Sequence, residues 1–463
     1  MFETSVYTTR RRILKDKFDS GLILFLGNEE SPANYAANTY NFRQDSTFLY
    51  FFGIDRPGFA ATIDIDNNLE TLFGNDISID EIIWTGTQPT VNDLAEIVGV
   101  KRSASTDKLN EQIITAIKKG RKIHFLPQYR LENIQKLSSM NGLNANNVND
   151  YCSEKLVKAV IAQRSVKSSE EIAEIDEAVD IASKMHLAAM KMAKPETDER
   201  KIAGMIEGIA SSLGYGLSFR PIVSINGQTL HNPYYENKMK AGDLLVNDSG
   251  AESKLHYASD ITRTIPVGGK FSDKQKEIYQ VVLKAETNSI DSVKPGITNK
   301  ELHLSAANII AAGLIEIGLM FGNPREAVDA GAHTLFFPHG LGHMLGLDVH
   351  DMEGLGEEYV GYDETVNRSD EFGLKNLRLA KTLQTGYVFT IEPGIYFIPE
   401  LIDMWKTQNR HSEFINYDML ENFMDFGGIR IEDNVLVTED GYRVLGSKPI
   451  PKSIEEVEAI VGK

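Results

Sequence analysis

A long amphipathic segment that begins near residue 169 is the feature that most limits how this chain folds. Ser168 is followed three residues later by Glu171, which is the spacing of a capping box at the start of a helix. Apolar residues then recur at helical intervals over residues 169–193, and Pro195 ends the run. Short strand-like runs alternate with helical patterns before this segment, whereas strand-like runs with glycine and proline dominate after residue 222. We therefore predict two domains.

The first domain, over residues 1–160, is predicted to be mixed α/β. Short apolar or β-branched runs bounded by turn residues predict strands, and a run that ends in lysines and a glycine predicts a helix. The expected strands cover residues 21–27, 58–66, 69–74, 81–86 and 122–127, and the expected helix covers residues 107–120.

The second domain, over residues 161–463, is rich in strand-like runs after residue 222. These runs alternate with predicted helices near residues 274–292 and 298–318, without a regular βαβ rhythm. This order favours an α+β fold with a mainly antiparallel sheet over a doubly wound parallel one. Residues 397–426 are predicted to be an excursion between two strands.

Composition narrows the classes of partner. The formal net charge is −18, so a nucleic acid or an anionic membrane would be repelled. No stretch approaches the ~20 apolar residues of a membrane span, and the N-terminal segment lacks the apolar run of a signal peptide. Cys152 is the single cysteine, which excludes an intramolecular disulfide and favours a reducing compartment. We therefore expect a cytoplasmic protein in which Cys152 is not catalytic.

Two aspartates lie on either side of a predicted turn. Asp248 ends the apolar run LLVND, and Asp260 begins the run DITRTIPV. A hairpin would bring both carboxylates to the same level, where they would repel each other unless a cation lay between them. Taken alone, each is equally well explained as an aspartate at a turn or strand end.

Three of the ten histidines lie together in PHGLGHMLGLDVHD, residues 338–351. His339 and His343 are four apart, but the glycines around them argue against a helix. An extended segment whose backbone approaches another group closely fits better. His350 completes the set, and structural histidines in a loop are the alternative.

Two further carboxylates lie in strand-like runs. Glu392 precedes Pro393 in TIEPGIYF, either at a strand end or buried with a partner. Arg430 and Glu432 are two apart in GGIRIEDNVLVT and share one strand face, where a salt bridge is the alternative.

Jointly, these residues predict a two-metal hydrolase. Four carboxylates carry four negative charges, which two divalent cations would balance, and oxygen ligands without cysteine favour Mn²⁺, Co²⁺ or Fe²⁺ over a structural zinc site. Two such ions activate water and stabilise an oxyanion. No H-E-x-x-H, G-x-S-x-G, Walker or C-x-x-C motif offers another chemistry. The predicted ligands are Asp248, Asp260, His343, Glu392 and Glu432.

The order of these motifs resembles the proline-specific metallopeptidases of the pita-bread fold, aminopeptidase P and prolidase. The motifs are NDSG, SDITRT, HGLGHMLGLDVHD, IEPGIY and GGIRIED, and residues 42–54 (FRQDSTFLYFFGI) are similar to the N-terminal domain of that family. The resemblance implies a creatinase-like N-terminal domain and a C-terminal pita-bread domain whose curved, mainly antiparallel sheet is flanked by helices.

The resemblance also implies the metal chemistry. The five ligands would hold two divalent ions, usually Mn²⁺ with Zn²⁺ as a further alternative, and Asp260 and Glu432 would bridge them. Glu392 would double as the general base.

Further roles follow from the resemblance for residues around the metals. His231 and His339 would line the substrate pocket. His350 would stabilise the scissile carbonyl as its oxygen becomes negative, and Arg430 would orient neighbouring groups.

One spacing departs from the family. Asp248 and Asp260 are twelve positions apart, one more than is usual. We expect a turn around Ser253–His256 to absorb the extra residue, because a shift inside a strand would move one carboxylate to the other face.

The family contains two activities. Aminopeptidase P removes an N-terminal residue that precedes proline, whereas prolidase cuts Xaa-Pro dipeptides and grips their free carboxylate. Arg378 stands where prolidases hold a carboxylate-binding arginine, with a surface arginine as the alternative. We predict an Xaa-Pro aminopeptidase acting on proline-containing peptides. The alternative is prolidase, including an organophosphate side activity.

Other members of the fold class are disfavoured. Non-catalytic pita-bread binding proteins and the metal-free creatinases lack the five-ligand set. Relatives of this type form dimers or tetramers, so we expect a homo-oligomer. By analogy Trp84 could reach a neighbour's active site, but we favour a tryptophan in the core or at a domain interface.

Overall fold

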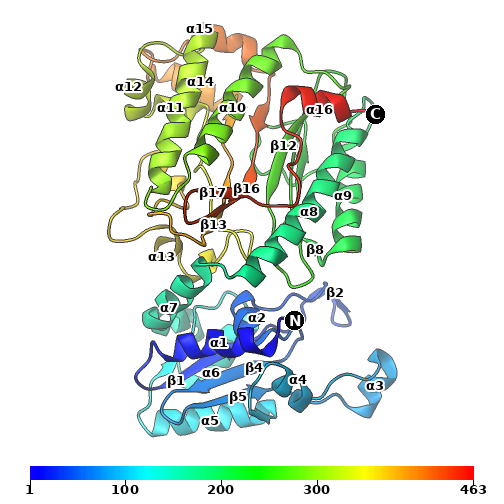
Figure 1. Ribbon diagram of the computed structural model, residues 1–463, viewed down its shortest axis with the longest axis vertical. Helices are drawn as coiled ribbons and strands as arrows, with labels where there is room; N and C mark the ends of the chain where they lie inside the picture. The colour runs from blue at the N-terminus through cyan, green and yellow to red at the C-terminus, as the bar shows by residue number, and fades with distance from the viewer. The chain divides into compact units, whose positions relative to one another are not determined.

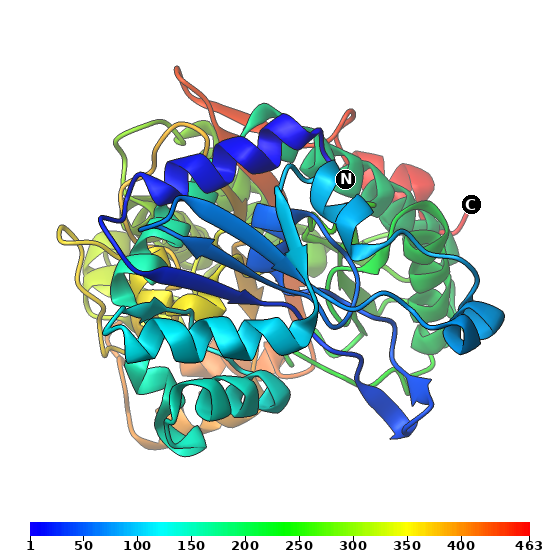
Figure 2. The ribbon, with the colours of Figure 1, turned by 90° about the horizontal axis from the view of Figure 1, so that it is seen from below.

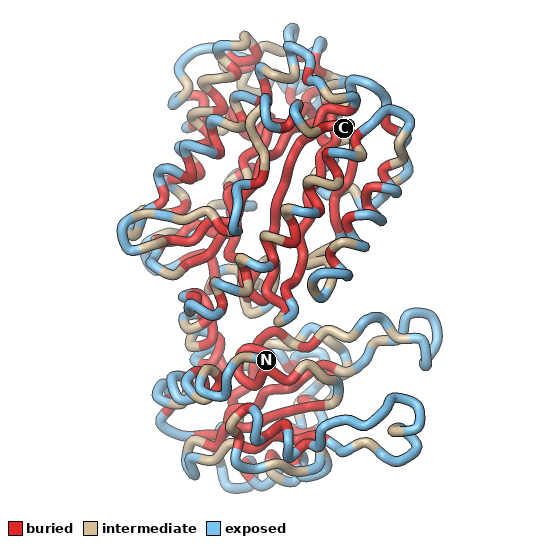
Figure 3. Tube along the Cα trace, turned by 45° about the vertical axis from the view of Figure 1, so that its right-hand side comes forward, coloured by how far each residue is buried: buried red, intermediate tan, exposed pale blue.

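The computed structural model describes residues 1–463, which form two compact units, Met1–Arg164 and Ser165–Lys463 (Figure 1). Each unit has buried strands at its centre and exposed outer helix faces and loops (Figure 3).

The first unit is built from short strands and helices. Its elements are α1 (Thr4–Lys15), β1 (Leu22–Leu26), β2 (Pro32–Tyr35), β3 (Asn38–Thr39), α2 (Ser46–Phe52), β4 (Ala60–Asp64), β5 (Leu69–Phe73), α3 (Ile79–Thr85), α4 (Val91–Ile97), β6 (Arg102–Ala104), α5 (Thr106–Lys118), β7 (Ile123–His124), α6 (Leu131–Asn141), η1 (Ala145–Tyr151) and α7 (Glu154–Ser165).

A mixed sheet of order β6-β5-β4-β1-β7 forms the centre of this unit, with helices on both faces (Figure 2). β1 pairs antiparallel with β4 and parallel with β7. Leu24 on one face packs with apolar residues of α5 and α6, and Phe25 on the other face contacts Phe51 and Phe52 of α2. The mixed α/β architecture predicted for this part is therefore observed.

One predicted strand in this unit is wrong. Residues 81–86 lie mostly in helix α3, which a capping box begins: the Glu81 amide donates to the Ser78 hydroxyl, and the Ser78 amide donates to the Glu81 carboxylate. The β-branched pair before Trp84 suggested a strand, but the cap decides in favour of the helix. No residue of α3 is buried, and Trp84 is 87% exposed. The expectation that Trp84 lies in the core or at a domain interface is therefore also wrong.

The second unit is larger and contains longer helices. Its elements are α8 (Ser169–Met192), α9 (Glu199–Leu213), β8 (Gly216–Leu217), β9 (Ile222–Ser224), β10 (Leu244–Ser249), β11 (Ala251–Glu252), β12 (Ile261–Pro266), α10 (Asp273–Asp291), α11 (Asn299–Ile317), α12 (Pro324–Asp329), η2 (Ala332–Leu335), η3 (Glu353–Leu355), α13 (Glu357–Gly361), η4 (Leu374–Asn376), β13 (Val388–Ile391), β14 (Gly394–Tyr396), α14 (Pro399–Thr407), α15 (Tyr417–Leu420), η5 (Glu421–Phe423), β15 (Gly428–Arg430), β16 (Asp433–Val437), β17 (Tyr442–Val444) and α16 (Ile454–Ile460).

Antiparallel pairing connects the strands of the second unit. β10 lies between β9 and β12, β16 lies between β13 and β17, and β14 pairs with β15. A single antiparallel bridge between Thr262 and Glu432 joins β12 to the segment between β15 and β16. α8 contacts β10 and β12, whereas α10 contacts β13, β14 and β15. The predicted antiparallel sheet with flanking helices is therefore observed.

Local sequence signals account for the helices of this unit. Ser168 caps α8 through the predicted capping box with Glu171, and the helix ends before Pro195. The buried stripe of α8 follows the apolar periodicity. The predicted excursion at residues 397–426 contains α14, α15 and η5. None of the helices combines the length and apolar composition needed to cross a bilayer.

Candidate metal centre and substrate pocket

One cavity of about 620 Å³ in the second unit gathers all of the predicted site residues. Strand ends and loops form its wall. The predicted residues that line it are His231, Asp248, Asp260, His339, His343, His350, Arg378, Glu392, Arg430 and Glu432.

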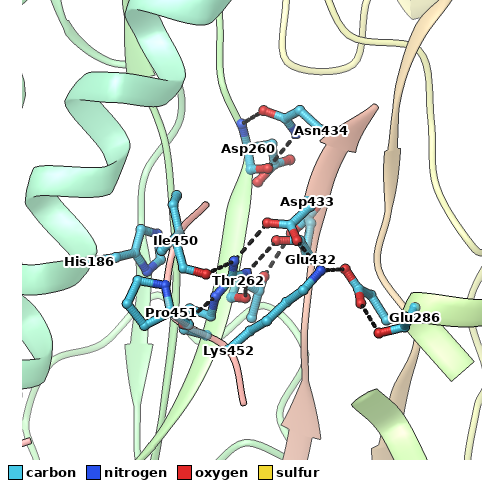
Figure 4. A network of polar contacts seen from close by, with 12 residues as sticks. His186, Asp260, Thr262, Glu286, Glu432, Asp433, Asn434, Ile450, Pro451 and Lys452 are labelled. Atoms are coloured by element: carbon cyan, nitrogen blue, oxygen red, sulfur yellow. Dashed lines mark hydrogen bonds and ion pairs between the residues drawn. The ribbon is translucent and has the colours of Figure 1, made fainter. Parts of the chain in front are cut away.

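Strand pairing places two aspartates on one face of the sheet. β10 pairs with β12 so that Asp248 lies opposite Thr262. Asp260 is two residues before Thr262, and side chains alternate along a strand, so Asp260 projects to the same face as Asp248. Asn434 fixes the backbone of Asp260. Its side chain accepts a hydrogen bond from the Asp260 amide at 3.1 Å and donates one to the Asp260 carbonyl at 2.5 Å (Figure 4).

The connection between these aspartates contains the expected turn. The His256 amide donates to the Ser253 carbonyl at 3.0 Å, and His256 has a φ of 69°. The ladder between β10 and β12 runs without a register shift. The extra residue therefore lies in the connection, where it does not change the face of the sheet to which Asp248 and Asp260 project.

Close backbone packing brings His343 towards Glu392. The Thr390 amide donates to the His343 carbonyl at 3.0 Å, and the His343 amide donates to the Thr390 hydroxyl at 3.1 Å. A Cβ atom at Gly342 would lie 1.9 Å from the Thr390 carbonyl oxygen, so only glycine fits there. The predicted close approach of the glycine-rich segment is therefore observed, and His343 Nε2 lies 3.8 Å from Glu392 Oε1.

Glu432 is held by β12 and by the network behind it. The Thr262 hydroxyl donates to Glu432 Oε2 at 2.7 Å, and the Glu432 amide donates to the Thr262 carbonyl at 3.1 Å. Arg263 donates to the carbonyl oxygens of both residues and to Asp433 Oδ1. Lys452 forms a 2.6 Å ion pair with Asp433 (Figure 4). These contacts leave Glu432 little freedom.

The donor set fits divalent cations. His343 Nε2 lies 3.3 Å from Asp260 Oδ2, and the ligand atoms of Asp260, His343 and Glu432 all lie within 4.8 Å of one another. Oδ1 of Asp248, Oδ1 of Asp260 and Oε1 of Glu432 are buried and accept no hydrogen bond. Buried carboxylate oxygens without donors are costly, and a cation bound to them removes that cost.

Burial and mutual repulsion raise the pKa values of three carboxyl groups. Burial, followed by the charges of Asp248 and Glu392, raises the pKa of Asp260 well above its ordinary value. Burial, followed by the charge of Asp260, does the same to the pKa of Glu432. Burial raises the pKa of Glu392 to about 7, although His343 opposes the shift. Without cations the cluster therefore binds protons, which cations would displace.

Arg430 connects the metal cluster with the pocket wall. It donates to Asp248 Oδ2 at 2.6 Å, to the Tyr396 hydroxyl at 2.9 Å and to the Thr262 hydroxyl at 3.2 Å. The Tyr396 hydroxyl lies 2.8 Å from His339 Nε2, and His339 Nδ1 lies 2.8 Å from the carbonyl of the next residue. A carbonyl only accepts, so Nδ1 carries the proton and Tyr396 donates to Nε2. Burial lowers the pKa of His339 to about 3, so its ring is neutral.

His350 faces the cavity beside the ring of His343, with 4.0 Å between the ring centroids. His350 Nδ1 lies 3.0 Å from Glu353 Oε2, which also accepts a hydrogen bond from Arg378 Nη1 at 2.5 Å. Burial lowers the pKa of His350 to about 4. His231, in the loop between β9 and β10, also lines the cavity, and burial lowers its pKa.

Three side chains at this site were missed by sequence reasoning: Thr262, Glu353 and Tyr396. Thr262 lies two residues after Asp260, so strand alternation alone could have placed it on the same face. Glu353 follows His350 by three residues, which is the reach of a turn. These spacings occur throughout any sequence and select these residues only once the ligands are known.

The matches to known families define a metal-dependent peptidase. Residues 173–439 match metallopeptidase family M24, and residues 7–124 match the aminopeptidase P N-terminal domain. The chain belongs to metallopeptidase family M24. It is therefore a hydrolase that uses divalent metal ions, and the predicted two-domain fold class is confirmed.

Individual relatives resemble the chain over nearly its whole length. A probable Xaa-Pro aminopeptidase of Aspergillus terreus is 33% identical over 436 residues, covering 91% of this chain and 89% of the relative. Zinc-substituted E. coli aminopeptidase P in complex with product has a TM-score of 0.79 and 29% identity, covering 99% of this chain and 98% of its own. Proline aminopeptidase P II from Yersinia pestis has a TM-score of 0.81 and 26% identity, covering 99% of each chain.

Proposed function

We propose that this chain is an Xaa-Pro aminopeptidase, which removes the N-terminal residue that precedes a proline. The observation that carries the proposal is the group of three buried carboxylate oxygens without hydrogen-bond donors, in the cavity that also contains His343 and Glu392. The names of the relatives, Xaa-Pro aminopeptidase and aminopeptidase P, support the proline-directed substrate.

The residues that would hold two divalent ions are Asp248, Asp260, His343, Glu392 and Glu432. When bound, the ions supply Lewis-acid chemistry that activates water and polarises the scissile carbonyl. Mn²⁺ suits this oxygen-rich set, and Co²⁺, Fe²⁺ and Zn²⁺ are the alternatives.

Side chains around the ligands would move protons and orient the peptide. Glu392 takes a proton from the attacking water and delivers it to the leaving proline nitrogen. His350 would donate from Nε2 to the carbonyl oxygen as that oxygen gains charge. This donation requires protons on both ring nitrogens, a form that burial disfavours by lowering the pKa of His350 to about 4 and that the Glu353 carboxylate at Nδ1 favours. His231 and His339 line the pocket, and Arg430 keeps Asp248 in place.

Arg378 bears on the choice between aminopeptidase and dipeptidase. A dipeptidase needs Arg378 to bind the free carboxylate of its substrate. Arg378 Nη1 donates to Glu353 Oε2 at 2.5 Å and to Glu357 Oε2 at 3.5 Å, so two acidic side chains compete with any substrate carboxylate. This competition, together with the names of the relatives, favours the aminopeptidase.

The test compares peptides of different length on the manganese-loaded enzyme. We expect release of the first residue from a pentapeptide with proline second, and no release from the same peptide with alanine in place of proline. Cleavage restricted to Xaa-Pro dipeptides would establish the prolidase alternative instead. Cleavage of the alanine control at an equal rate would contradict proline specificity altogether.

We also propose a cytoplasmic location and a homo-oligomeric state. The first is supported by the single, unpaired Cys152. The second is supported by the exposed apolar residues Ile79, Ile83 and Trp84 of α3. Light scattering on the purified wild type and on the Ile83→Ser variant tests the homo-oligomeric state. A monomeric wild type would contradict it.

A further inference from the structure

A chain of polar contacts runs outward from His350, and from Glu353 onward its members alternate in charge. His350 Nδ1 lies 3.0 Å from Glu353, Glu353 lies 2.5 Å from Arg378, Arg378 lies 3.5 Å from Glu357, and Glu357 lies 2.5 Å from Arg368. The Glu353 side chain is 17% exposed, against 34% for His350 and 38% for Arg378. Glu353 is therefore the most enclosed of these three, and both of its neighbours bind the same oxygen, Oε2.

The backbone between His350 and Glu353 is shaped to bring the carboxylate back onto the ring. Met352 has a φ of 64° and is 2% exposed. A non-glycine residue in this conformation is strained and persists only where the surrounding structure holds it. The Glu353 amide donates to the His350 carbonyl at 3.3 Å, which closes the turn. A strained turn that returns a carboxylate to a histidine points to a role for that contact.

We propose that Glu353 is a positioning residue for His350 and that Arg378 holds Glu353 in place. The proposal rests on the proposed function, in which His350 acts on the scissile carbonyl. A carboxylate accepts hydrogen bonds, so Glu353 keeps a proton on Nδ1 and turns Nε2 towards the cavity. It also fixes the orientation of the His350 ring, as an orienting carboxylate does beside other catalytic histidines.

The proposal gives Arg378 a different role from that of a carboxylate clamp, and the two roles differ in their kinetics. A clamp contributes to binding, so its loss raises KM for dipeptides and spares longer peptides. A residue that acts through Glu353 and His350 contributes in the transition state, so its loss lowers kcat for both.

The kinetic experiment uses the full-length, metal-loaded enzyme and a pentapeptide with proline second. We expect Glu353→Ala to lower kcat about 10–100-fold with little change in KM. Glu353→Gln keeps an accepting oxygen and should retain most of the activity, whereas Glu353→Leu, of similar size, accepts no hydrogen bond and carries the kinetic test if the alanine variant does not fold. In a His350→Ala background, the loss of Glu353 should change kcat less than about twofold, since residues that act as a unit are not additive.

Arg443→Met is the matched control. Arg443 forms an ion pair with Asp176 at 2.9 Å, and its side chain is 41% exposed, close to the value for Arg378. The Arg443→Met variant should leave kcat unchanged, whereas Arg378→Met should lower kcat on the dipeptide and on the pentapeptide alike. An unchanged kcat in Glu353→Ala, or a full additional loss in the His350→Ala background, would overturn the positioning role. A KM rise confined to dipeptides in Arg378→Met would overturn the role of Arg378.

A spectroscopic readout separates this proposal from the proposed function. In zinc-loaded protein labelled with ¹⁵N-histidine, the His350 signals are those that His350→Ala removes. Glu353→Ala should shift the Nδ1 signal of His350, and Arg443→Met should not. An unshifted Nδ1 signal refutes the positioning role whatever the substrate is. A shifted signal in an enzyme that does not cleave Xaa-Pro peptides would instead refute the proposed function alone.

Discussion

The buried ion pair between Lys167 and Asp351 provides a test of how the histidine-bearing segment is held. Lys167 Nζ lies 2.8 Å from Asp351 Oδ2, and both side chains are 1% exposed. Asp351 follows His350, and its Oδ1 accepts a hydrogen bond from the Asp348 amide at 3.3 Å. The pair therefore anchors the segment that carries His350 from behind. The perturbation is Lys167→Met, which keeps an unbranched apolar chain and removes the charge.

The magnitude follows from the burial of both partners. At 2.8 Å and an effective dielectric constant of about 20, the attraction is about 6 kcal/mol. Desolvation costs several kcal/mol for each ion, so the intact pair contributes little net stability. Removal of Lys167 alone breaks this buried pair from one side, which costs about 3–5 kcal/mol. Lys167→Met/Asp351→Asn removes both charges and should therefore be more stable than Lys167→Met alone.

Tryptophan fluorescence during thermal unfolding measures this effect in the second unit. The chain has two tryptophans; Trp405 is fully buried in the second unit, and Trp84 is 87% exposed in the first. The red shift on unfolding therefore comes from Trp405. At about 2 °C per kcal/mol for a unit of this size, Lys167→Met should lower Tm by about 6–10 °C. A Tm within about 2 °C of wild type, or a double variant less stable than Lys167→Met, would refute the reasoning.

Three further predictions concern the metal cluster. Asp260→Asn and His343→Ala should each lower turnover by about 100-fold or more while the far-UV circular dichroism spectrum is kept, and retained turnover above about 10% would contradict their role as ligands. Thr262→Val should weaken Mn²⁺ binding by about 10-fold in isothermal titration, because its hydroxyl orients Glu432. The control is Thr264→Val, which removes a buried hydroxyl bound only to the Arg430 backbone and should leave Mn²⁺ binding unchanged. Equal weakening of Mn²⁺ binding in the two variants would show a general packing effect. The pKa of Glu392 in the folded, metal-free protein is raised to about 7. Its contribution to the free energy of unfolding is therefore present at low pH and is lost as the pH rises through about 7. The rise in Tm on adding Mn²⁺ should therefore be larger at about pH 8 than at about pH 5.5, and equal rises would contradict this.

Elements with local signals could be predicted from the sequence. Helix α8 begins at the capping box of Ser168 and Glu171, both of which lie within one turn of the chain. The strands that carry Asp248 and Asp260 follow from apolar runs on either side of a turn. Helix α3 could not be predicted correctly, because the β-branched residues before Trp84 and the cap at Ser78 favour different structures over the same few residues.

The residues that gather in the cavity could be predicted from the sequence, but not the contacts that support them. Each ligand residue alone is consistent with an ordinary turn or strand end, and the order of the motifs made the set specific. Contacts that hold the ligands join distant positions: the Thr262–Glu432 hydrogen bond spans 170 residues, and the Arg430–Asp248 contact spans 182. No local pattern encodes such pairs, so Thr262 and Tyr396 are recognised only in the folded chain. Glu353 lies three residues after His350, a spacing too common to single it out.

Metal content is the most direct test of the central claim, that five side chains hold two divalent ions. The purified protein is loaded with Mn²⁺, freed of unbound metal by gel filtration and measured by inductively coupled plasma mass spectrometry. We expect two ions per chain in the wild type and fewer in Asp260→Asn, because Asp260 is expected to bind both. Less than one ion per wild-type chain would contradict the account.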